Sequence, residues 1–169
     1  TANVTLTFDV YQSFTSTTTY INTDGTLKVQ PYQSSFGSTH YFNGSTRNSL
    51  TTDFFPINGN SETLTGLTIG KDGNTADITV ANAQTIAGPI KVYGGTITLN
   101  ADLATTNAGD ISIYSDNPIA GLGTTRTLTA AGAFKYIPRG TTFSADVTYP
   151  ITNLTATSTG LTIGKSTND

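Results

Sequence analysis

The feature that most constrains this chain is a repeat of nine residues separated by 94 positions. The stretch GLTIGKDGN occupies residues 66–74, and GLTIGKSTN occupies residues 160–168. Self-similarity of this kind within one chain is typical of architectures in which successive units stack on their neighbours. The sequence therefore predicts a stacked repeat protein.

The resemblance between the two halves extends upstream of this motif. Residues 25–31 resemble residues 132–138 at an offset of 107, and residues 55–57 resemble residues 149–151 at an offset of 94. The difference of 13 residues predicts an insertion in the first copy, near residues 38–50. That stretch is polar and rich in turn formers, as expected of a tolerated surface loop.

The start of the chain also resembles the residues directly after the first copy of the motif. Residues 1–6 (TANVTL) are similar to residues 75–80 (TADITV). We therefore divide the chain into copy A, residues 1–74, and copy B, residues 75–169, with about 33 extra residues in copy B near 86–118. The residues that follow the first motif resemble the start of the chain, and the chain ends with the second motif. We therefore expect the chain to be an excerpt of a longer tandem array.

The composition indicates an all-β protein. Only 11% of the residues are charged, and Thr, Gly and Asn are abundant. Thr, Val, Ile, Tyr and Phe suit pleated, half-buried surfaces, whereas Gly, Asn and Asp supply turns. A net charge of −3 with scattered basic residues argues against a nucleic-acid partner, and no apolar run is long enough for membrane insertion.

The apolar pattern predicts short strands and no helix. Two spacings are close to one coil of a parallel β-solenoid: 19 residues from Ile78 to Ile97, and 21 from Ile90 to Ile111. We therefore predict a parallel β-solenoid-like repeat stack, with tandem immunoglobulin-like β-sandwich modules as the alternative. The Pro-x4-Phe spacing at Phe36 favours the sandwich locally, because it interrupts the even periodicity.

Strand alternation assigns the residues of this solenoid to structural roles. The side chains expected to point into the core are Leu67, Ile69, Ile78, Val80, Ile90, Val92, Ile97, Leu99, Ile111 and Ile113. Four glycines are expected to set turns or close approaches: Gly66, Gly70, Gly94 and Gly95.

The sequence offers little catalytic chemistry. His40 is the sole histidine, it falls in the predicted insertion, and no nucleophile motif accompanies it, so we expect a solvated loop residue. The acidic residues lie mostly at strand ends, where Asp caps turns. We expect no enzyme activity, although parallel β-helices that cleave polysaccharides use paired carboxylates. Thr-x-Thr pairs recur without the constant spacing that an ice-binding face needs.

No cofactor is expected, and calcium is the one metal with candidate ligands. The chain has no cysteine, and its possible ligands are oxygen atoms. One candidate group is Asp72 and Asn74 with Asp77, and the other is Asp110 with Asp116 and Asn117. Neither group matches a known calcium loop, and turn formation explains the same residues.

Several stretches resemble a known class of protein. The repeat sequences of giant secreted surface adhesins, especially those of Bacteroidota, are similar to two stretches of this chain, GLTIGKDGNTADITV and QTIAGPIKVYGGTITLNADLATTNAGDISIYS. The segment LKVQPYQSSF, with FFPI and GLTIGK, resembles the connector between such repeats. The resemblance covers residues 62–169 well and residues 1–61 less well. It implies an extracellular, cell-surface location and a filamentous stalk serving attachment, biofilm formation or gliding motility, without catalytic residues.

Three functions remain as hypotheses. The first is a structural stalk segment of an extracellular filamentous adhesin, whose partners are neighbouring repeats and, beyond them, a surface polysaccharide or a host or substrate surface. The second is a subunit of a self-polymerising extracellular filament that joins end to end by strand exchange through residues 3–8. The third is a carbohydrate-active β-helix enzyme, which would need converging carboxylates.

Overall fold

A computed structural model describes residues 2–9, 23–42, 64–122, 126–147, 154–156 and 160–165. All regular secondary structure in these ranges is β-strand, and every strand pairs in parallel with its neighbours. The predicted solenoid is thus confirmed. The immunoglobulin-like alternative is wrong, because such sandwiches are built from antiparallel sheets.

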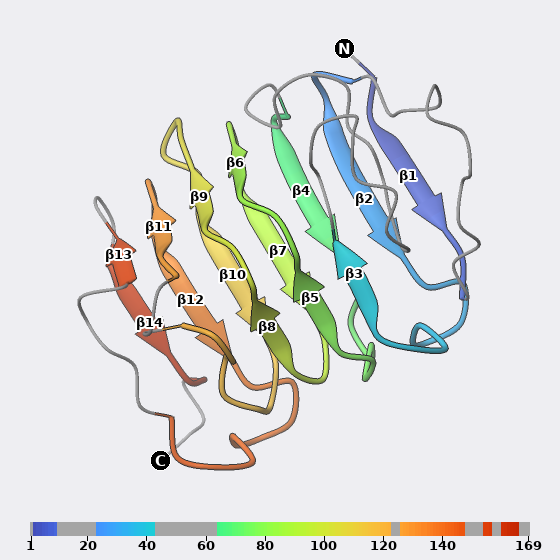
Figure 1. The fold of residues 1–169 in the computed structure, drawn as a ribbon, viewed down its shortest axis with the longest axis vertical. Coiled ribbons are helices and arrows are strands. Elements are labelled where there is room, and N and C mark those ends of the chain that lie inside the picture. The colour runs from blue at the N-terminus through green and yellow to red at the C-terminus, as the bar shows by residue number, and fades with distance from the viewer. Residues whose placement is uncertain are drawn as a thin grey trace.

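The strands form three sheets that run along the molecule (Figure 1). The seven-stranded sheet contains, in spatial order, β1 (Val4–Thr7), β2 (Thr26–Gln30), β4 (Gly66–Ile69), β7 (Ile90–Tyr93), β10 (Ile111–Tyr114), β12 (Phe134–Ile137) and β14 (Leu161–Ile163). The four-stranded sheet contains β13 (Leu154–Ala156), β11 (Leu128–Ala130), β9 (Leu103–Thr105) and β6 (Gln84–Ile86). The three-stranded sheet contains β3 (His40–Phe42), β5 (Ile78–Val80) and β8 (Ile97–Leu99).

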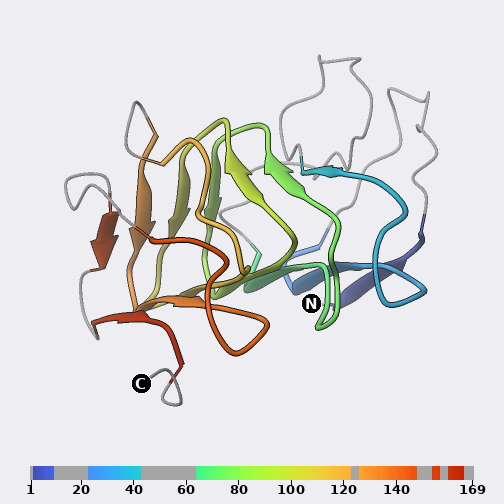
Figure 2. The same ribbon diagram turned by 90° about the horizontal axis from the view of Figure 1, so that it is seen from below.

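Each complete coil visits the three sheets in turn, as β4, β5 and β6 do before the chain returns to the seven-stranded sheet at β7. In Figure 2 the seven-stranded sheet forms one side of the molecule, and the other two sheets face it across the core. The two spacings that suggested a solenoid are both registers of adjacent coils: Ile78 pairs with Ile97, and Ile90 pairs with Ile111.

The core is a set of apolar rows that run along the solenoid axis. All ten residues expected to point inward are buried, none with more than 1% of its surface exposed. They line up across coils because the parallel register places Leu67, Ile90 and Ile111 side by side on adjacent strands. Burial of one such Ile, Leu or Val side chain contributes about 1.5–3 kcal/mol to stability.

Each Pro-x4-Phe element packs its phenyl ring against another aromatic ring, although the partners differ between the two copies. Phe36 is buried, with its ring centroid 5.5 Å from that of Phe8, and the ring centroid of Phe143 lies 4.5 Å from that of Tyr136. The break in periodicity that pointed to a sandwich is therefore a loop that turns a phenyl ring into the end of a coil.

The repeated motif keeps its backbone geometry in both copies. Gly70 and Gly164 come directly after β4 and β14 with φ of 78° and 96°, a region that favours glycine. The Gly70 amide donates to the Val29 carbonyl at 2.7 Å, and the Gly164 amide donates to the Tyr136 carbonyl at 2.9 Å. Val29 and Tyr136 are also equivalent residues of the sequence repeat.

The lysine of the motif makes the same contact in both copies. The Lys71 ammonium donates to the Tyr32 carbonyl at 3.1 Å, and the Lys165 ammonium donates to the Arg139 carbonyl at 3.0 Å. Tyr32 and Arg139 are 107 positions apart, which is the offset of the sequence repeat in this region. The two GLTIGK copies are therefore equivalent in packing as well as in sequence.

The start of the chain, however, takes a place that the sequence comparison did not assign to it. Residues 3–9 (NVTLTFD) are equivalent in the structure to residues 110–116 (DISIYSD), rather than to residues 75–80, which contribute β5 of the three-stranded sheet. Three pairs of hydrogen bonds match at an offset of 107. Asn3 Oδ1 accepts from the Thr26 amide as Asp110 Oδ1 does from the Ala133 amide, and Asp9 Oδ1 accepts from the Gln33 amide as Asp116 Oδ1 does from the Gly140 amide. The backbone carbonyls of Asp9 and Asp116 accept from the amides of Gly37 and Ser144, respectively.

The four glycines singled out in the sequence meet different surroundings. A Cβ at Gly95 would lie well under 3.0 Å from the Thr75 carbonyl oxygen and 2.8 Å from Asp77 Oδ1. Gly70 is similarly confined by the Tyr93 carbonyl oxygen of the next coil, whereas a Cβ at Gly94 would first meet the side chains of Ile97 and Ile78. At Gly66 the nearest atom to an added Cβ would be Thr26 Cγ2 at 3.4 Å, so the structure gives no steric reason for glycine there.

Substitution of alanine at two of these glycines should separate the close approach from the sequence pattern. We expect Gly95→Ala to lower the free energy of unfolding by about 2 kcal/mol or more, because its methyl group meets backbone of the preceding coil. Gly66→Ala should change it by no more than about 1 kcal/mol, since alanine is favoured over glycine in a strand. Urea unfolding of the two variants beside the parent chain measures both values, and equal losses would contradict the packing described.

Candidate functional site

The acidic residues at the corners tie one coil to the next. Oδ1 of Asp77 accepts a hydrogen bond from the Thr96 amide at 2.7 Å, and Oδ1 of Asp102 accepts one from the Thr127 amide at 2.8 Å. In both cases the acceptor and the donor stand immediately before paired strands. A backbone amide at a sharp corner has no ladder partner, so the carboxylate satisfies it. The expected turn role is thus performed between coils.

Two residues of the first calcium candidate, Asn74 and Asp77, are engaged in such contacts, whereas the third, Asp72, is exposed. Asn74 is fully buried, and its Oδ1 accepts from Ser35 Oγ at 2.9 Å and from the Phe36 amide at 3.1 Å. Its Nδ2 donates to the Tyr93 carbonyl at 2.7 Å. The side-chain amide therefore joins three coils and has no oxygen directed to a cation, while Asp77 caps the next coil.

The second calcium candidate is similarly occupied. Asp110 forms an ion pair with Lys135 at 2.7 Å, and Asp116 forms one with Arg139 at 3.2 Å. The hydrogen bond from Lys135, followed by the one from the Ala133 amide, lowers the pKa of the Asp110 carboxyl. Within the described ranges, no three His, Cys, Asp or Glu side chains gather as a metal site would require.

Arg139 and Asn74 make a connection that the sequence did not suggest. Besides Asp116, the Arg139 guanidinium donates to the Asn74 carbonyl, 65 residues earlier in the chain. Asn74 is one of the residues shared by the two copies of the repeated motif, and that sharing was the only available signal of its structural role. These two residues hold the corner at the C-terminal ends of the seven-stranded sheet.

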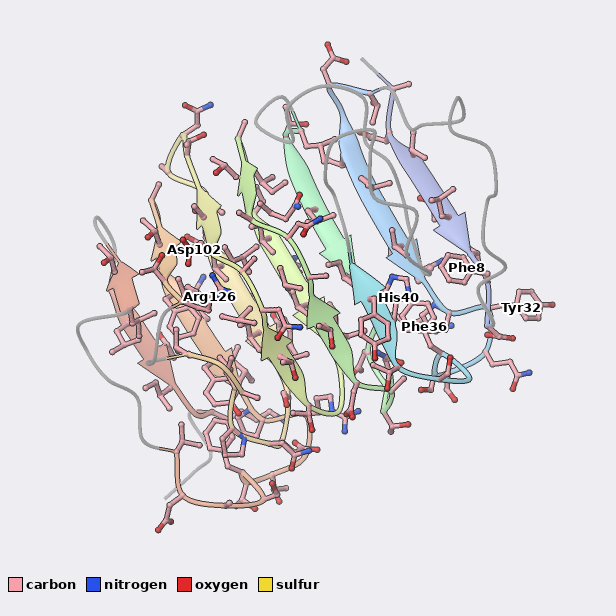
Figure 3. The ribbon with its side chains drawn as sticks, viewed as in Figure 1. Phe8, Tyr32, Phe36, His40, Asp102 and Arg126 are labelled. Carbon is pink, nitrogen blue, oxygen red and sulfur yellow. The ribbon has the colours of Figure 1, made fainter. Side chains whose placement is uncertain are left out.

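His40 is not the solvated loop residue that the sequence suggested. It is the first residue of β3, it is 3% exposed, and its amide donates to the Asp77 carbonyl at 2.8 Å. Its ring stacks on Phe36 with centroids 4.8 Å apart and lies 5.8 Å from Phe8 (Figure 3). Polar neighbours hid this position, because an aromatic cluster that joins Phe8 to Phe36 and His40, far away in the chain, leaves no local periodicity. Burial lowers the pKa of His40 to about 4.

The depressed pKa of His40 predicts a loss of stability in mild acid. In the unfolded chain the imidazole titrates near 6.5, so between about pH 6.5 and 4 the unfolded state binds a proton that the folded state does not. The stabilisation is present above this range and is lost as the pH falls through it, by up to about 3 kcal/mol. The chain has no other histidine. Urea midpoints between pH 7 and 4.5 should fall for the parent and stay nearly constant for His40→Phe; parallel curves would contradict this assignment.

The outer face of the seven-stranded sheet carries a regular row of polar side chains. We call this the lysine row; across the sheet it reads Thr5, Lys28, Thr68, Lys91, Ser112, Lys135 and Thr162. Within this row, hydroxyl and lysine residues alternate from β1 to β14, and the hydroxyl residue on β10, Ser112, is buried. The lysines also interrupt the threonines, so this face has no continuous threonine lattice of the kind that would order ice.

Two tyrosines lie beside the lysine row on the same sheet. Tyr93 and Tyr114 are paired across β7 and β10, with ring centroids 4.3 Å apart and planes within 4° of parallel. Burial, followed by the neighbouring Tyr114, raises the pKa of Tyr93 to about 12, so its phenol is neutral at physiological pH.

The end of the stack at β14 exposes apolar side chains. Leu161 and Ile163 pair with the fully buried Phe134 and Tyr136, yet 55% and 47% of their surfaces are exposed. Their equivalents in the first copy, Leu67 and Ile69, are 1% exposed because β7 covers them. The same sequence is therefore covered by a coil in one place and uncovered in the other.

Comparisons with protein-family models, with curated proteins and with solved structures gave no match. In the ranges that the structure describes, no helix is long and apolar enough to cross a membrane. The candidate functional surfaces are therefore defined by this chain's own geometry: the open end of the stack and the outer face of its longest sheet.

Proposed function

We propose that this chain is a structural stalk segment of an extracellular filamentous adhesin that serves surface attachment, biofilm formation or gliding motility. The observation that carries the proposal is the uncovered end of the coil stack at Leu161 and Ile163, where the repeated motif presents its core residues to solvent. Another coil stacked there would bury both side chains and pair the free edge of β14.

The shape of the stack supports a mechanical role. β1 and β14 are the two edges of one parallel sheet, and they lie at opposite ends of the molecule (Figure 1). Six strand intervals of about 4.8 Å make this segment a rod of about 29 Å along the axis. Addition of further segments would lengthen the rod without a change of geometry, and each new contact would add stability.

The resemblance of the sequence to the repeats of giant surface adhesins supports the same proposal. It implies a secreted location and a stalk without catalytic residues. The corner carboxylates are consistent with this, because Asp77, Asp102, Asp110 and Asp116 each accept a hydrogen bond from a backbone amide of another coil. We therefore propose a non-catalytic role and place a carbohydrate-active enzyme third.

The second candidate is a subunit that polymerises end to end. The edge strands β1 and β14 belong to one parallel sheet, so separate copies could join head to tail, which is a heterologous contact that forms open filaments. In that case the joint between subunits would be non-covalent.

The mass of the native material tests these two candidates. We expect material isolated from cell surfaces without proteolysis to run on a denaturing gel far above 17.7 kDa, with peptides that join one repeat to the next. A band near 17.7 kDa, together with filaments that form with rising concentration and are abolished by Leu161→Asp with Ile163→Asp, would replace the stalk by the polymerising subunit. Antibody labelling of intact cells tests the location, and recovery in the cytosol alone would overturn both.

A further inference from the structure

The lysine row is a linear array of positive charge parallel to the solenoid axis. Lys28, Lys91 and Lys135 lie on β2, β7 and β12, two strands apart in each case. Since neighbouring strands are about 4.8 Å apart, the lysine positions recur about every 9.6 Å. All three point outward, because they alternate with buried residues along their strands.

The array has little negative charge to balance it. The seven residues of the row include no acid, and the one ion pair that the structure describes within it joins Lys135 to Asp110 of the neighbouring row. Lys91 is exposed and Lys28 is half-buried. Solubility alone would be served as well by alternating charges of both signs, whereas this row places three cations on one face of a chain whose net charge is −3.

We propose that the outer face of the seven-stranded sheet binds a linear acidic polysaccharide that lies along the solenoid axis. An extended sugar residue is about as long as one strand interval, so a chain with one carboxylate or sulfate per disaccharide presents its charges with the period of the lysines. The half-buried Thr68, which lies between Lys28 and Lys91, faces the intervening sugar and supplies a hydrogen bond to its hydroxyl groups, whereas Ser112 is buried.

The spacing favours a polysaccharide over a nucleic acid. Each strand of a DNA duplex carries a charge about every 3.4 Å along the helix axis, far more densely than the lysines recur, and the affinity of proteins for nucleic acid depends on many neutralised phosphates. The Tyr93 and Tyr114 rings also stack on each other instead of lying apart as separate platforms for bases. Their phenols lie on the same strands as Lys91 and Ser112.

This inference does not depend on the stalk role, because a single segment carries the whole row. Affinity would be low for one segment and would rise with the number of segments aligned on one polymer, as expected of multivalent contacts. A stack of coils that repeats this face would therefore bind the polysaccharide along its whole side.

The test compares hyaluronan, which has one carboxylate per disaccharide, with neutral dextran and single-stranded DNA as immobilised probes. We expect the 169-residue chain to bind hyaluronan and not dextran, and the double variant Lys28→Gln with Lys91→Gln to bind at least about tenfold more weakly. Arg126→Gln is the matched control: it removes the same kind of charge beside Asp102, on the four-stranded-sheet side (Figure 3), and should stay within about twofold of the parent.

Three results would overturn the proposal. They are the absence of hyaluronan binding by the parent chain, an equal loss in Arg126→Gln, and binding of DNA as tight as that of hyaluronan, which would indicate a general polyanion surface. Urea unfolding of each variant shows that its fold is retained, and an unchanged urea midpoint for the double variant is expected because both lysines point outward.

Discussion

The parallel, in-register pairing of one coil with the next is the interaction on which the rest of this structure depends. It fixes the distance between equivalent residues at about 4.8 Å, so each core position becomes a row of stacked side chains and each surface position becomes a row of outward-facing residues. The apolar rows stabilise the stack. At the corners between strands, backbone amides have no partner in the sheet and need another hydrogen-bond acceptor. Asp77 and Asp102 do this by accepting hydrogen bonds from the following coil, and Gly95 allows the close approach by leaving room for the neighbouring backbone.

Much of this fold could be predicted from local pattern. The alternation of apolar residues at Ile78, Val80, Ile97 and Leu99 predicts both the strands and the side chains that face the core. The number of residues between equivalent isoleucines predicts the coil length. These features are local or strictly periodic, so one sequence is enough to reveal them. The two copies of the GLTIGK motif are likewise equivalent in structure, because the same glycine conformation and the same lysine contact recur.

The features that sequence reasoning missed all depend on contacts between coils. By residue type, NVTL at residues 3–6 is similar to both DITV at 77–80 and DISI at 110–113. Only the hydrogen bonds to the following coil show that the second match is the structural one. His40 packs against Phe8 of another segment as well as against nearby Phe36, and Asn74 makes hydrogen bonds that join three coils and accepts one from Arg139. The lysine row was invisible for the same reason, because its lysines are far apart in the chain until the register aligns them.

The two proposed surfaces use different directions of the same lattice. Along the axis, the uncovered β14 offers backbone and apolar side chains to a further coil, which suits extension of a stalk. Across the side, the outer face of the seven-stranded sheet offers a periodic row of charge, which suits a periodic polymer. Both would become more effective as more coils are added, because the first adds nearest-neighbour stability and the second adds binding sites in line.

X-ray fibre diffraction from aligned native filaments would show whether parallel coils stack continuously from one segment to the next. Continuous stacking predicts a strong meridional reflection at about 4.8 Å, because the strands lie across the filament axis and repeat along it. Filaments without that reflection, whose axial repeat corresponds instead to the length of separate modules, would contradict it.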